Sequence, residues 1–539
     1  MSGEERFDYL VVGAGPAGIQ AAYFLEQAGR DYLVVEAGEA PGTFFTRFPR
    51  HRTLISINKV HTGWDDPELN LRTDWNSLLS AGNAPLFTAV TPRYFPAADD
   101  LVGYLADFAE THKLNIRHNT RITAITRPPA EDGGARGDFR AAAEDGTVFR
   151  ARRLIVATGL TRPYIPPIEG AELADSYHDV SVDPADFTDQ RVLIIGRGNS
   201  AFETADNLVE TAAVIHVAGP GALRLAWQTH FVGHLRAVNN NFLDTYQLKS
   251  QNALLDGEIM SIKRDGENGP YRVAVKFVRV EEIIKEIPYD RVILATGFRF
   301  DASLFGPECR PELTIKDRFP AQTAAWESPN VPDLYFAGTI TQVRDFKKST
   351  SGFIHGFRYG VRALHRILEQ RYHDEPWPRR ELAAGPEAVA DAIITRINRT
   401  SALWQLFGFL ADTVTVAPGG AAAYHEEVPL AHLHQAVAEG DFGPVDRYCA
   451  ITLEYGADHD KVNPFDISVG RVAQADTGGL DGRYLHPVVR LFRAGELLAE
   501  HHLTENLENE WDREEVHRVP LVRFLTEHLQ PETAASSPS

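Results

Sequence analysis

The sequence predicts an α/β fold with two Rossmann-like dinucleotide-binding domains, the second inserted in the first, and a C-terminal mixed α/β domain. An apolar strand runs into a glycine-rich turn twice, at Gly13–Gly18 and at Gly196–Ala201. Matching strand–turn segments, ending in Thr158-Gly159 and Thr296-Gly297, lie before and after the second turn. They mark where the chain leaves the first domain and returns to it. The 539 residues also leave room for a third domain.

The first turn opens a helix directly after a buried strand. Gly13 permits the tight turn, Gly15 lets a pyrophosphate approach the backbone, and Gly18 lets the helix pack close to the strand. Free N–H groups at the start of the helix would hold the diphosphate. Glu36 ends the next strand, roughly 20 residues on, where a carboxylate commonly binds a ribose hydroxyl. Strand, glycines, helix and acid in this order predict a dinucleotide site.

The second turn repeats the pattern, with Ala201 in place of the third glycine. The strand after it ends at Ala218-Gly219, where a site that prefers NAD would carry an acid. Arg197 and Arg224 are near enough to meet a 2′-phosphate, although both would also suit a solvated surface. We therefore expect this site to take NADPH rather than NADH.

The domain boundaries follow from these segments and from a change in composition. A proline-marked stretch, residues 372–378, follows the second part of the first domain. Apolar spacing then predicts a helix from Pro386 to about Ala411, and alternating segments near 450–455 and 488–492 predict strands. We expect the first domain at 1–160 and 291–372, the inserted domain at 161–290, the C-terminal domain at 373–530 and a disordered tail at 531–539.

Composition excludes several classes of protein. Acidic residues outnumber basic ones, 74 to 54, which gives a net charge of −20 and disfavours nucleic acid and anionic membranes as partners. The two cysteines, Cys309 and Cys449, are too few and too far apart for a disulfide framework, a Cys-x-x-Cys centre or a thiolate zinc site. We expect no metal. No apolar run reaches the ~18 residues of a membrane span, and no signal segment is evident, so we expect a cytoplasmic protein.

A family resemblance runs through most of the chain. The residues that carry it are Phe48–Arg52, Leu54–Lys59, Asp74–Leu79, Gly196–Glu203, Leu243–Ser250 and Gly352–Tyr359. With the two turns, they make the chain resemble the two-dinucleotide-domain flavoproteins. It is similar to the flavin-containing monooxygenases and, over its whole length, to the endoplasmic-reticulum FAD-dependent oxidoreductases associated with protein degradation.

The resemblance implies FAD at the Gly13 turn and NADPH at the Gly196 turn. It does not imply the reduction of misfolded disulfides, because no cysteine pair could relay electrons to a dithiol. The residues expected to bind the two dinucleotides are Gly13, Gly15, Pro16, Ala17, Gly18, Glu36, Ile122, Thr158, Gly159, Gly196, Gly198, Asn199, Ser200, Arg224, Thr296, Gly297, Gly338, Phe353 and Ile354.

Two side chains are candidates for the chemistry that the resemblance implies. NADPH would reduce the flavin, and dioxygen would form a flavin C4a-hydroperoxide that survives in a dry pocket. Asn58 could both donate to and accept from that peroxide, although an asparagine here would also suit a turn. Lys249 is the second candidate, because single-component flavin-dependent halogenases resemble this same type of flavoprotein and need a lysine near the substrate. It would equally suit a bond to a neighbouring carboxylate or phosphate.

Three functions follow as hypotheses. The first is an NADPH-dependent FAD monooxygenase that oxidises a small nitrogen-, sulfur- or aromatic-containing metabolite. The second is a flavin-dependent halogenase of an aromatic substrate that uses Lys249. The third is a non-catalytic flavoprotein that senses or binds a partner. The expected partners are a small-molecule substrate and dioxygen, with halide for the second hypothesis and a homodimer as an open alternative.

Overall fold

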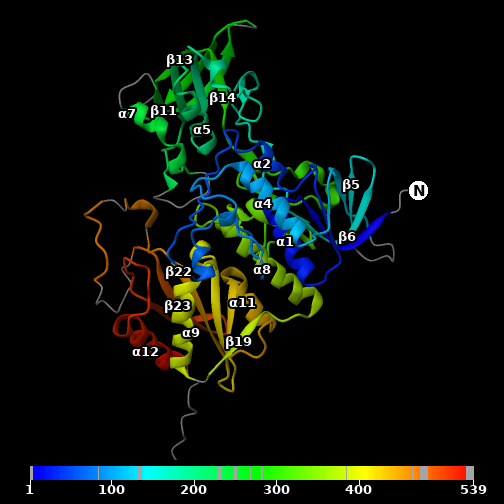
Figure 1. Ribbon diagram of the computed structural model, residues 1–539, viewed down its shortest axis with the longest axis vertical. Helices are drawn as coiled ribbons and strands as arrows, with labels where there is room; N and C mark the ends of the chain where they lie inside the picture. Colours follow the sequence, from blue (N-terminus) through cyan, green and yellow to red (C-terminus); the bar gives the residue numbers. More distant parts are fainter. Residues whose placement is uncertain are drawn as a thin grey trace, which may run out of the picture.

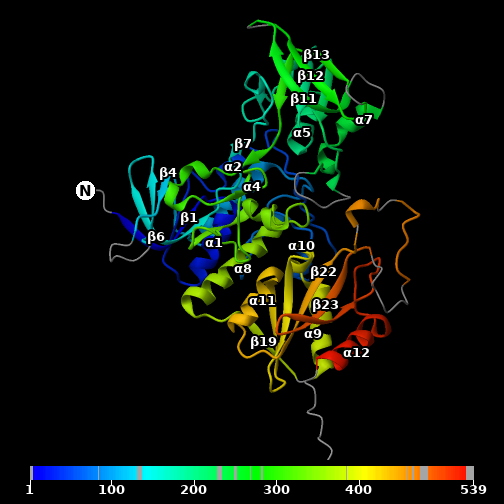
Figure 2. The same cartoon turned by 180° about the vertical axis from the view of Figure 1, so that it is seen from behind.

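The computed structural model describes residues 4–82, 84–129, 136–226, 234–247, 252–266, 269–280, 283–383, 385–457, 459–463, 466–473 and 483–529. Figure 1 shows three bodies in a row. The first domain lies in the middle, the inserted domain at one end and the C-terminal domain at the other, and the reverse view in Figure 2 shows the same order. The predicted α/β class with two Rossmann-like cores is confirmed.

The first domain is built on one seven-stranded sheet in the order β3-β2-β1-β6-β5-β4, with β18 also paired to β6. The strands β3, β2, β1 and β6 are parallel neighbours in that order, and β18 pairs in parallel with the end of β6. On the other side, β4, β5 and the start of β6 form an antiparallel meander. The strands are β1 (Glu5–Val12), β2 (Tyr32–Val35), β3 (Ile116–Arg117), β4 (Ile122–Thr126), β5 (Phe139–Ala143), β6 (Val148–Val156) and β18 (Leu334–Phe336). The helices are α1 (Pro16–Gln27), α2 (Thr43–Arg47), α3 (Pro67–Asn70), α4 (Ala98–Thr111) and α8 (Ile354–His373).

The inserted domain repeats this plan. Its sheet has the order β13-β12-β11-β10-β9-β14-β8, with β9, β10 and β14 parallel and a meander from β11 to β13. The strands are β8 (Asp175–Ser176), β9 (Arg191–Ile195), β10 (Val214–Gly219), β11 (Ala253–Arg264), β12 (Tyr271–Phe277), β13 (Ile284–Tyr289) and β14 (Arg291–Leu294), and the helices include α5 (Asn199–Leu208) and α7 (Asn241–Gln247). The expected boundary placed residues 291–294 in the first domain, but β14 pairs with β9 and lies in the inserted sheet.

Two chain crossings join these domains side by side. β7 (Arg162–Pro163) leaves the first domain and β15 (Phe298–Arg299) returns to it, and the two strands pair as a short antiparallel ribbon. A second small ribbon, β16 (Leu313–Thr314) with β17 (Phe319–Pro320), follows in the first domain. The chain therefore enters and leaves the inserted domain at one place.

The C-terminal domain is an antiparallel sheet in the order β19-β21-β20-β22-β23-β24 with helices packed on it. Its elements are β19 (Arg379–Leu382), α9 (Pro386–Arg399), α10 (Ala402–Gln405), β20 (Leu410–Val416), β21 (Ala422–Pro429), α11 (Leu430–Glu439), β22 (Arg447–Glu454), β23 (His486–Arg493), β24 (Glu496–His502) and α12 (Val519–His528). The strands expected near 450–455 and 488–492 are confirmed. The helix expected from Pro386 to about Ala411 is wrong at its end, because α9 stops at Arg399 and β20 already begins at Leu410.

A buried ion cluster joins α8 to the C-terminal sheet. The Glu427 side chain is 1% exposed and receives Arg362 and Arg366 from α8 and Arg396 from α9. Arg396 also pairs with buried Asp412 on β20, at 3.0 Å between Nε and Oδ2. The buried members of this cluster require one another, since a buried charge without its partner is costly. The cluster therefore fixes the C-terminal domain against the first domain.

Candidate active site at the two glycine turns

The first glycine turn has the backbone that its sequence predicts. Gly13 has φ +103°, a conformation that side chains disfavour, and its N–H donates to the carbonyl oxygen of Val35 at 2.8 Å. The helix α1 then begins at Pro16. A Cβ atom added to Gly15 would meet nothing within 4 Å, so this side of the turn is open. An open turn at a helix start has the shape and the partial charge that a diphosphate needs.

Glu36, which directly follows β2, bonds to the backbone of the first glycine turn. It is 8% exposed, and its carboxylate accepts from the backbone N–H groups of Ala14 at 2.7 Å and Gly38 at 2.9 Å. The carboxylate thus lies against the turn after the end of β2, and its role in binding a ribose stays a prediction. These residues fit the adenosine half of a dinucleotide.

The second turn is built in the same way. Gly196 has φ +134°, and a Cβ atom there would lie 2.1 Å from the carbonyl oxygen of Ala295, so only glycine is tolerated. The helix α5 begins at Asn199. The Asn199 amide is held by the following segment, because Nδ2 donates to the His234 carbonyl at 2.8 Å and Oδ1 accepts the Arg236 N–H at 2.9 Å.

The two arginines expected near a 2′-phosphate differ in their surroundings. Arg197 pairs with Asp256 at 2.7 Å. Its side chain also packs against Gly219, because a Cβ atom added to Gly219 would lie 3.1 Å from the Arg197 side chain. Arg224 is exposed. Arg224 is therefore the more accessible of the two for a phosphate.

A cavity of about 350 Å³ lies where the two turns meet. Both turns contribute to it, as do the strand ends that carry Thr158 and Gly338 and the start of α8. Its wall consists of Gly15, Pro16, Ala17, Phe44, Phe45, Phe48, Pro49, Leu54, Ile55, Ser56, Leu101, Ala157, Thr158, Gly159, Leu160, Tyr177, Asn199, Ser200, Glu203, Phe298, Gly338, Thr339, Gly352, Phe353, Ile354 and Phe357. The wall is mainly apolar and aromatic, which suits flat cofactor rings.

The predicted cofactor residues fall into four groups. Those in the cavity wall are Gly15, Pro16, Ala17, Thr158, Gly159, Asn199, Ser200, Gly338, Phe353 and Ile354. Those that shape the turns behind it are Gly13, Gly18, Gly196 and Gly198. Glu36 follows the end of β2, and Arg224 lies five residues after the end of β10. The remaining three lie neither in the wall nor in the two turns: Ile122 packs in the apolar core of the first sheet, Thr296 Oγ1 donates to the Tyr164 carbonyl, and the Gly297 carbonyl accepts the Tyr164 N–H at 2.8 Å.

Of the two residues predicted to take part in the chemistry, Asn58 lies among the described residues and Lys249 does not. Asn58 is 1% exposed, and its Nδ2 donates to the carbonyl oxygens of Thr91 at 2.7 Å and Arg93 at 3.4 Å. Its Oδ1 is buried and has no hydrogen-bond partner among the described residues. Ile55 and Ser56 line the cavity, whereas Asn58 does not. Lys249 lies outside the described residues, so its role stays a prediction.

A stack of side chains connects the cavity wall to the inserted domain. The His355 ring lies between those of Phe353, at 5.3 Å between centroids, and Trp75, at 4.1 Å. The guanidinium of Arg236 lies 4.7 Å from the centroid of Trp75. Burial holds the pKa of His355 well below its usual value, so the imidazole is neutral. The stack links the segment that holds Asn199 to the start of α8.

Sequence reasoning missed Tyr177 and Glu203, which both line the cavity. Tyr177 Oη donates to Glu203 Oε1. Burial raises the pKa of Glu203 to about 7, although Tyr177 and Arg50 oppose this effect. Glu203 lies one helical turn after Asn199, so the spacing along α5 could have placed it near the turn. Tyr177 is distant in sequence from both turns, and no local pattern marks it.

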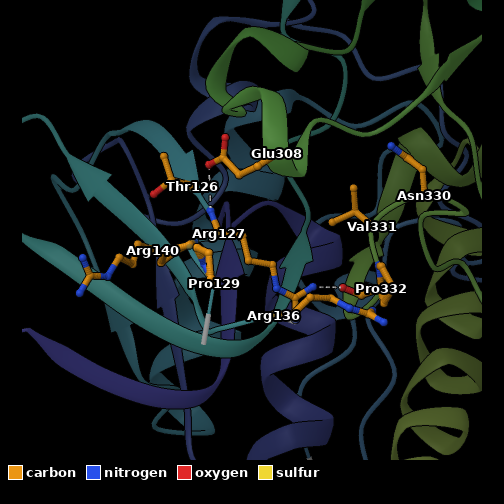
Figure 3. Close-up of a pocket in the computed structure, with 10 residues that line it drawn as sticks. Thr126, Arg127, Pro129, Arg136, Arg140, Glu308, Asn330, Val331 and Pro332 are labelled. Atoms are coloured by element: carbon orange, nitrogen blue, oxygen red, sulfur yellow. Dashed lines mark hydrogen bonds between the residues drawn. The ribbon is translucent and has the colours of Figure 1, made fainter. Parts of the chain in front are cut away.

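A second cavity, of about 480 Å³, shares no residue with the first. Figure 3 shows Arg127 within it, its backbone N–H directed to Glu308 and its guanidinium to the Pro332 carbonyl. The same guanidinium pairs with Asp333 at 2.7 Å. Arg140, also in the wall, pairs with Glu4 at 3.1 Å. These two cations are thus already satisfied by the protein.

Three further findings concern the cysteines, possible metal ligands and possible membrane-spanning helices. The cysteines are both buried and unpaired, and they belong to different apolar clusters. Within the described ranges, no three histidine, cysteine or acidic side chains gather as a metal site would require. No helix in the described part of the chain has both the length and the apolar character to cross a membrane.

Comparison with known proteins agrees with this geometry. Residues 10–338 match the family described as pyridine nucleotide-disulphide oxidoreductase. The chain is 39% identical to FAD-dependent oxidoreductase domain-containing protein 2 of Mus musculus, over 96% of this chain and 83% of that protein. Two solved structures, each 19% identical, cover 68% of this chain and 99% of their own: a flavin-containing monooxygenase from Stenotrophomonas maltophilia, with a TM-score of 0.52, and the bacillithiol disulfide reductase Bdr (YpdA) from Staphylococcus aureus, with a TM-score of 0.51.

Proposed function

Because the chain belongs to the pyridine nucleotide-disulphide oxidoreductase family, we propose that it is an NADPH-dependent FAD monooxygenase that oxidises a small nitrogen-, sulfur- or aromatic-containing metabolite. The observation that carries the proposal is the apolar cavity where the two glycine turns meet. Fold alone does not select a reaction, since proteins of this fold include a monooxygenase and a disulfide reductase. The choice between these reactions must therefore be argued from the residues of the site.

The turn from Gly13 to Gly18 and the Glu36 carboxylate would hold FAD. The turn from Gly196 to Ala201 and exposed Arg224 would hold NADPH. When bound, these groups supply hydride transfer from NADPH to the flavin and electron transfer from the flavin to dioxygen. The protein's own contribution is to place both groups in one cavity.

The cavity wall is suited to keep water out. Six phenylalanines line it, namely Phe44, Phe45, Phe48, Phe298, Phe353 and Phe357. Such a wall would limit the access of solvent to a reactive oxygen species, which would otherwise be lost as hydrogen peroxide. The aromatic lining supports oxygenation of a small organic substrate.

The cysteines disfavour the reductase chemistry of the wider family. Burial raises the pKa of Cys309 to about 11 and that of Cys449 to about 12. Both thiols are thus neutral at physiological pH, whereas exchange requires a thiolate. They also lie in separate apolar clusters, so no dithiol is available to pass electrons to a disulfide.

Oxygen stoichiometry tests the proposal. Purified holoprotein would be supplied with NADPH and a panel of amine, thioether and aromatic substrates, and NADPH, dioxygen, hydrogen peroxide and product would be measured together. We expect at least one substrate to lower peroxide release and to yield one oxygenated product per NADPH. Peroxide equal to NADPH with every substrate would contradict the proposal.

Halogenation is separated in the same experiment. Adding bromide should leave the product unchanged if the enzyme is an oxygenase. A brominated product that is lost in Lys249→Ala, with flavin reduction unchanged, would identify a halogenase instead. A flavin that NADPH does not reduce would favour a non-catalytic flavoprotein.

A further inference from the structure

Among the described residues that line the cavity at the two turns, only Tyr177 and Glu203 carry side chains that titrate. All other side chains in the wall are apolar, hydroxyl or amide groups. The two are bonded to each other, with Tyr177 Oη donating to Glu203 Oε1. A single acidic pair thus serves the whole cavity.

Both domains hold this pair in place. Glu203 is on α5 of the inserted domain and is 7% exposed, while Tyr177 follows β8 and is 5% exposed. The backbone N–H of Arg50, from the first domain, donates to Tyr177 Oη at 3.1 Å. The ring of Phe48 stacks on that of Tyr177 at 5.9 Å between centroids. The hydroxyl is therefore fixed by one donor and has Glu203 as its acceptor.

Most charged or titratable side chains around the pair either bond to other groups or are neutral at pH 7. Arg50 Nη2 donates to the Val180 carbonyl at 2.7 Å, and its Nε is buried without a partner among the described residues. Arg47 pairs with exposed Asp179. Burial lowers the pKa of His178 and lowers that of His51 to about 4, so both imidazoles are neutral at pH 7. The charge of Arg50 and the hydroxyl of Ser200 remain as the polar neighbours of the pair.

Burial is the largest effect on the proton of Glu203. It raises the pKa of that carboxyl to about 7, while the Tyr177 hydroxyl and Arg50 act in the opposite direction. Burial also raises the pKa of Tyr177 above its usual range, so the phenol stays protonated. Near neutral pH the carboxyl can therefore both hold and release a proton, as a general acid at its working pH must.

The proposed reaction needs such a group. Monooxygenation follows substrate + O₂ + NADPH + H⁺ → oxygenated substrate + NADP⁺ + H₂O. The hydride and the substrate each give two electrons to dioxygen, one oxygen atom enters the substrate, and one proton is consumed. We propose that Glu203 is the proton-holding residue of the cavity, that it supplies this proton and regains one from solvent, and that Tyr177 is its positioning residue. This inference rests on the proposed function for its reaction, but the proton itself can be observed without turnover.

The first measurement detects the proton directly. Infrared difference spectra of the holoprotein between pH 5 and pH 9 should contain a protonated-carboxyl band that titrates near pH 7. Glu203→Gln should remove this band. Asp206→Asn is the matched control, because Asp206 is on the same helix, does not line the cavity and has a pKa raised by burial to about 6. The control should leave the band that titrates near pH 7 in place.

The second measurement is the pH profile of product formation with a coupled substrate. Glu203→Gln should lower turnover at pH 7 by about 100-fold and remove the limb near pH 7. Tyr177→Phe should move that limb to higher pH, since the lost hydroxyl stabilised the carboxylate. A destabilised variant would lose activity equally at every pH, so the shift distinguishes a proton role from a structural one.

The outcomes separate the two proposals. A band that titrates near pH 7 without oxygenation of any substrate would leave the proton pair standing and reject the monooxygenase. Oxygenation with an unchanged pH profile in Glu203→Gln would reject the pair and leave the function standing. The pair is also rejected if no carboxyl band near pH 7 depends on Glu203.

Discussion

A Cβ atom added to Gly18 would lie 1.9 Å from the carbonyl oxygen of Gly13. The helix α1 therefore packs directly on the turn that precedes it, and any side chain at Gly18 would separate the two. Gly15, between them, meets no such obstacle. The same turn thus contains one glycine that the fold requires and one that only a ligand would require.

This difference gives a test of the FAD site. We expect Gly15→Val to fold with an unchanged far-ultraviolet circular dichroism spectrum but to lose its yellow colour, because the side chain fills the space for the diphosphate. Gly18→Val should fail to fold, since the clash is with backbone. A yellow Gly15→Val protein would mean that the flavin does not approach this turn.

Coenzyme preference should depend on Arg224. We expect Arg224→Ala to raise the dissociation constant of NADPH by about tenfold, equivalent to ~1.4 kcal/mol, while that of NADH stays unchanged. Arg197→Ala should weaken both coenzymes alike, since Arg197 supports the turn through Asp256. Titration calorimetry with each coenzyme checks this. Equal losses in Arg224→Ala would place the 2′-phosphate elsewhere.

If Asn58 takes part in the oxygen chemistry, its replacement should increase the release of hydrogen peroxide. Asn58→Ala removes the bond to the Thr91 carbonyl and the free Oδ1, so we expect more hydrogen peroxide per NADPH and less product. Comparing the melting temperature with the wild-type value separates an effect on the segment near Thr91 from an effect on the chemistry. Unchanged coupling would remove Asn58 from the reaction.

The ion cluster at Glu427 gives a prediction about stability and pH. Burial alone would raise the pKa of Glu427, but Arg362, Arg366 and Arg396 outweigh it and hold the pKa at about 2. This carboxylate therefore stabilises the fold above its unfolded pKa, and the contribution is lost as the pH falls through about 2. We expect Glu427→Gln to destabilise the protein at pH 7 by about 3–5 kcal/mol.

Thermal unfolding of the Glu427→Gln protein checks this. Its deficit in melting temperature should be largest near neutral pH and should shrink toward pH 2. The exposed pair of Arg272 with Asp265 is the control, and Asp265→Asn should leave the melting temperature unchanged. A deficit in Glu427→Gln that is constant with pH would show that packing, rather than charge, is responsible.

The sequence predicts the turns well because their geometry is local. The glycines, the strands before them and the acid at Glu36 follow from spacing along one segment. The pair of Tyr177 and Glu203 could not be predicted in this way, since it forms only when the strand β8 and the helix α5 come together. Asn58 shows a second limit. The residue type suggested chemistry, but only the fold reveals that its amide is bonded to the Thr91 carbonyl.

The C-terminal domain shows the same limit for secondary structure. Apolar spacing continues from α9 through Leu406 and Leu410, so periodicity alone extends the helix. In the structure α9 ends at Arg399, and Arg396 in its last turn pairs with Asp412 and Glu427. Pairing of β20 with β21 and β22 then overrides the helical pattern. Tertiary pairing decides such segments.

The ribbon of β7 and β15 has a consequence for protein engineering. Phe298 is paired with Pro163 and Arg299 with Arg162, so the inserted domain enters and leaves at neighbouring positions. A module whose ends meet can be exchanged without moving the host. We therefore expect chimaeras that carry the corresponding module of a relative to keep the first sheet intact and to acquire the donor's coenzyme preference.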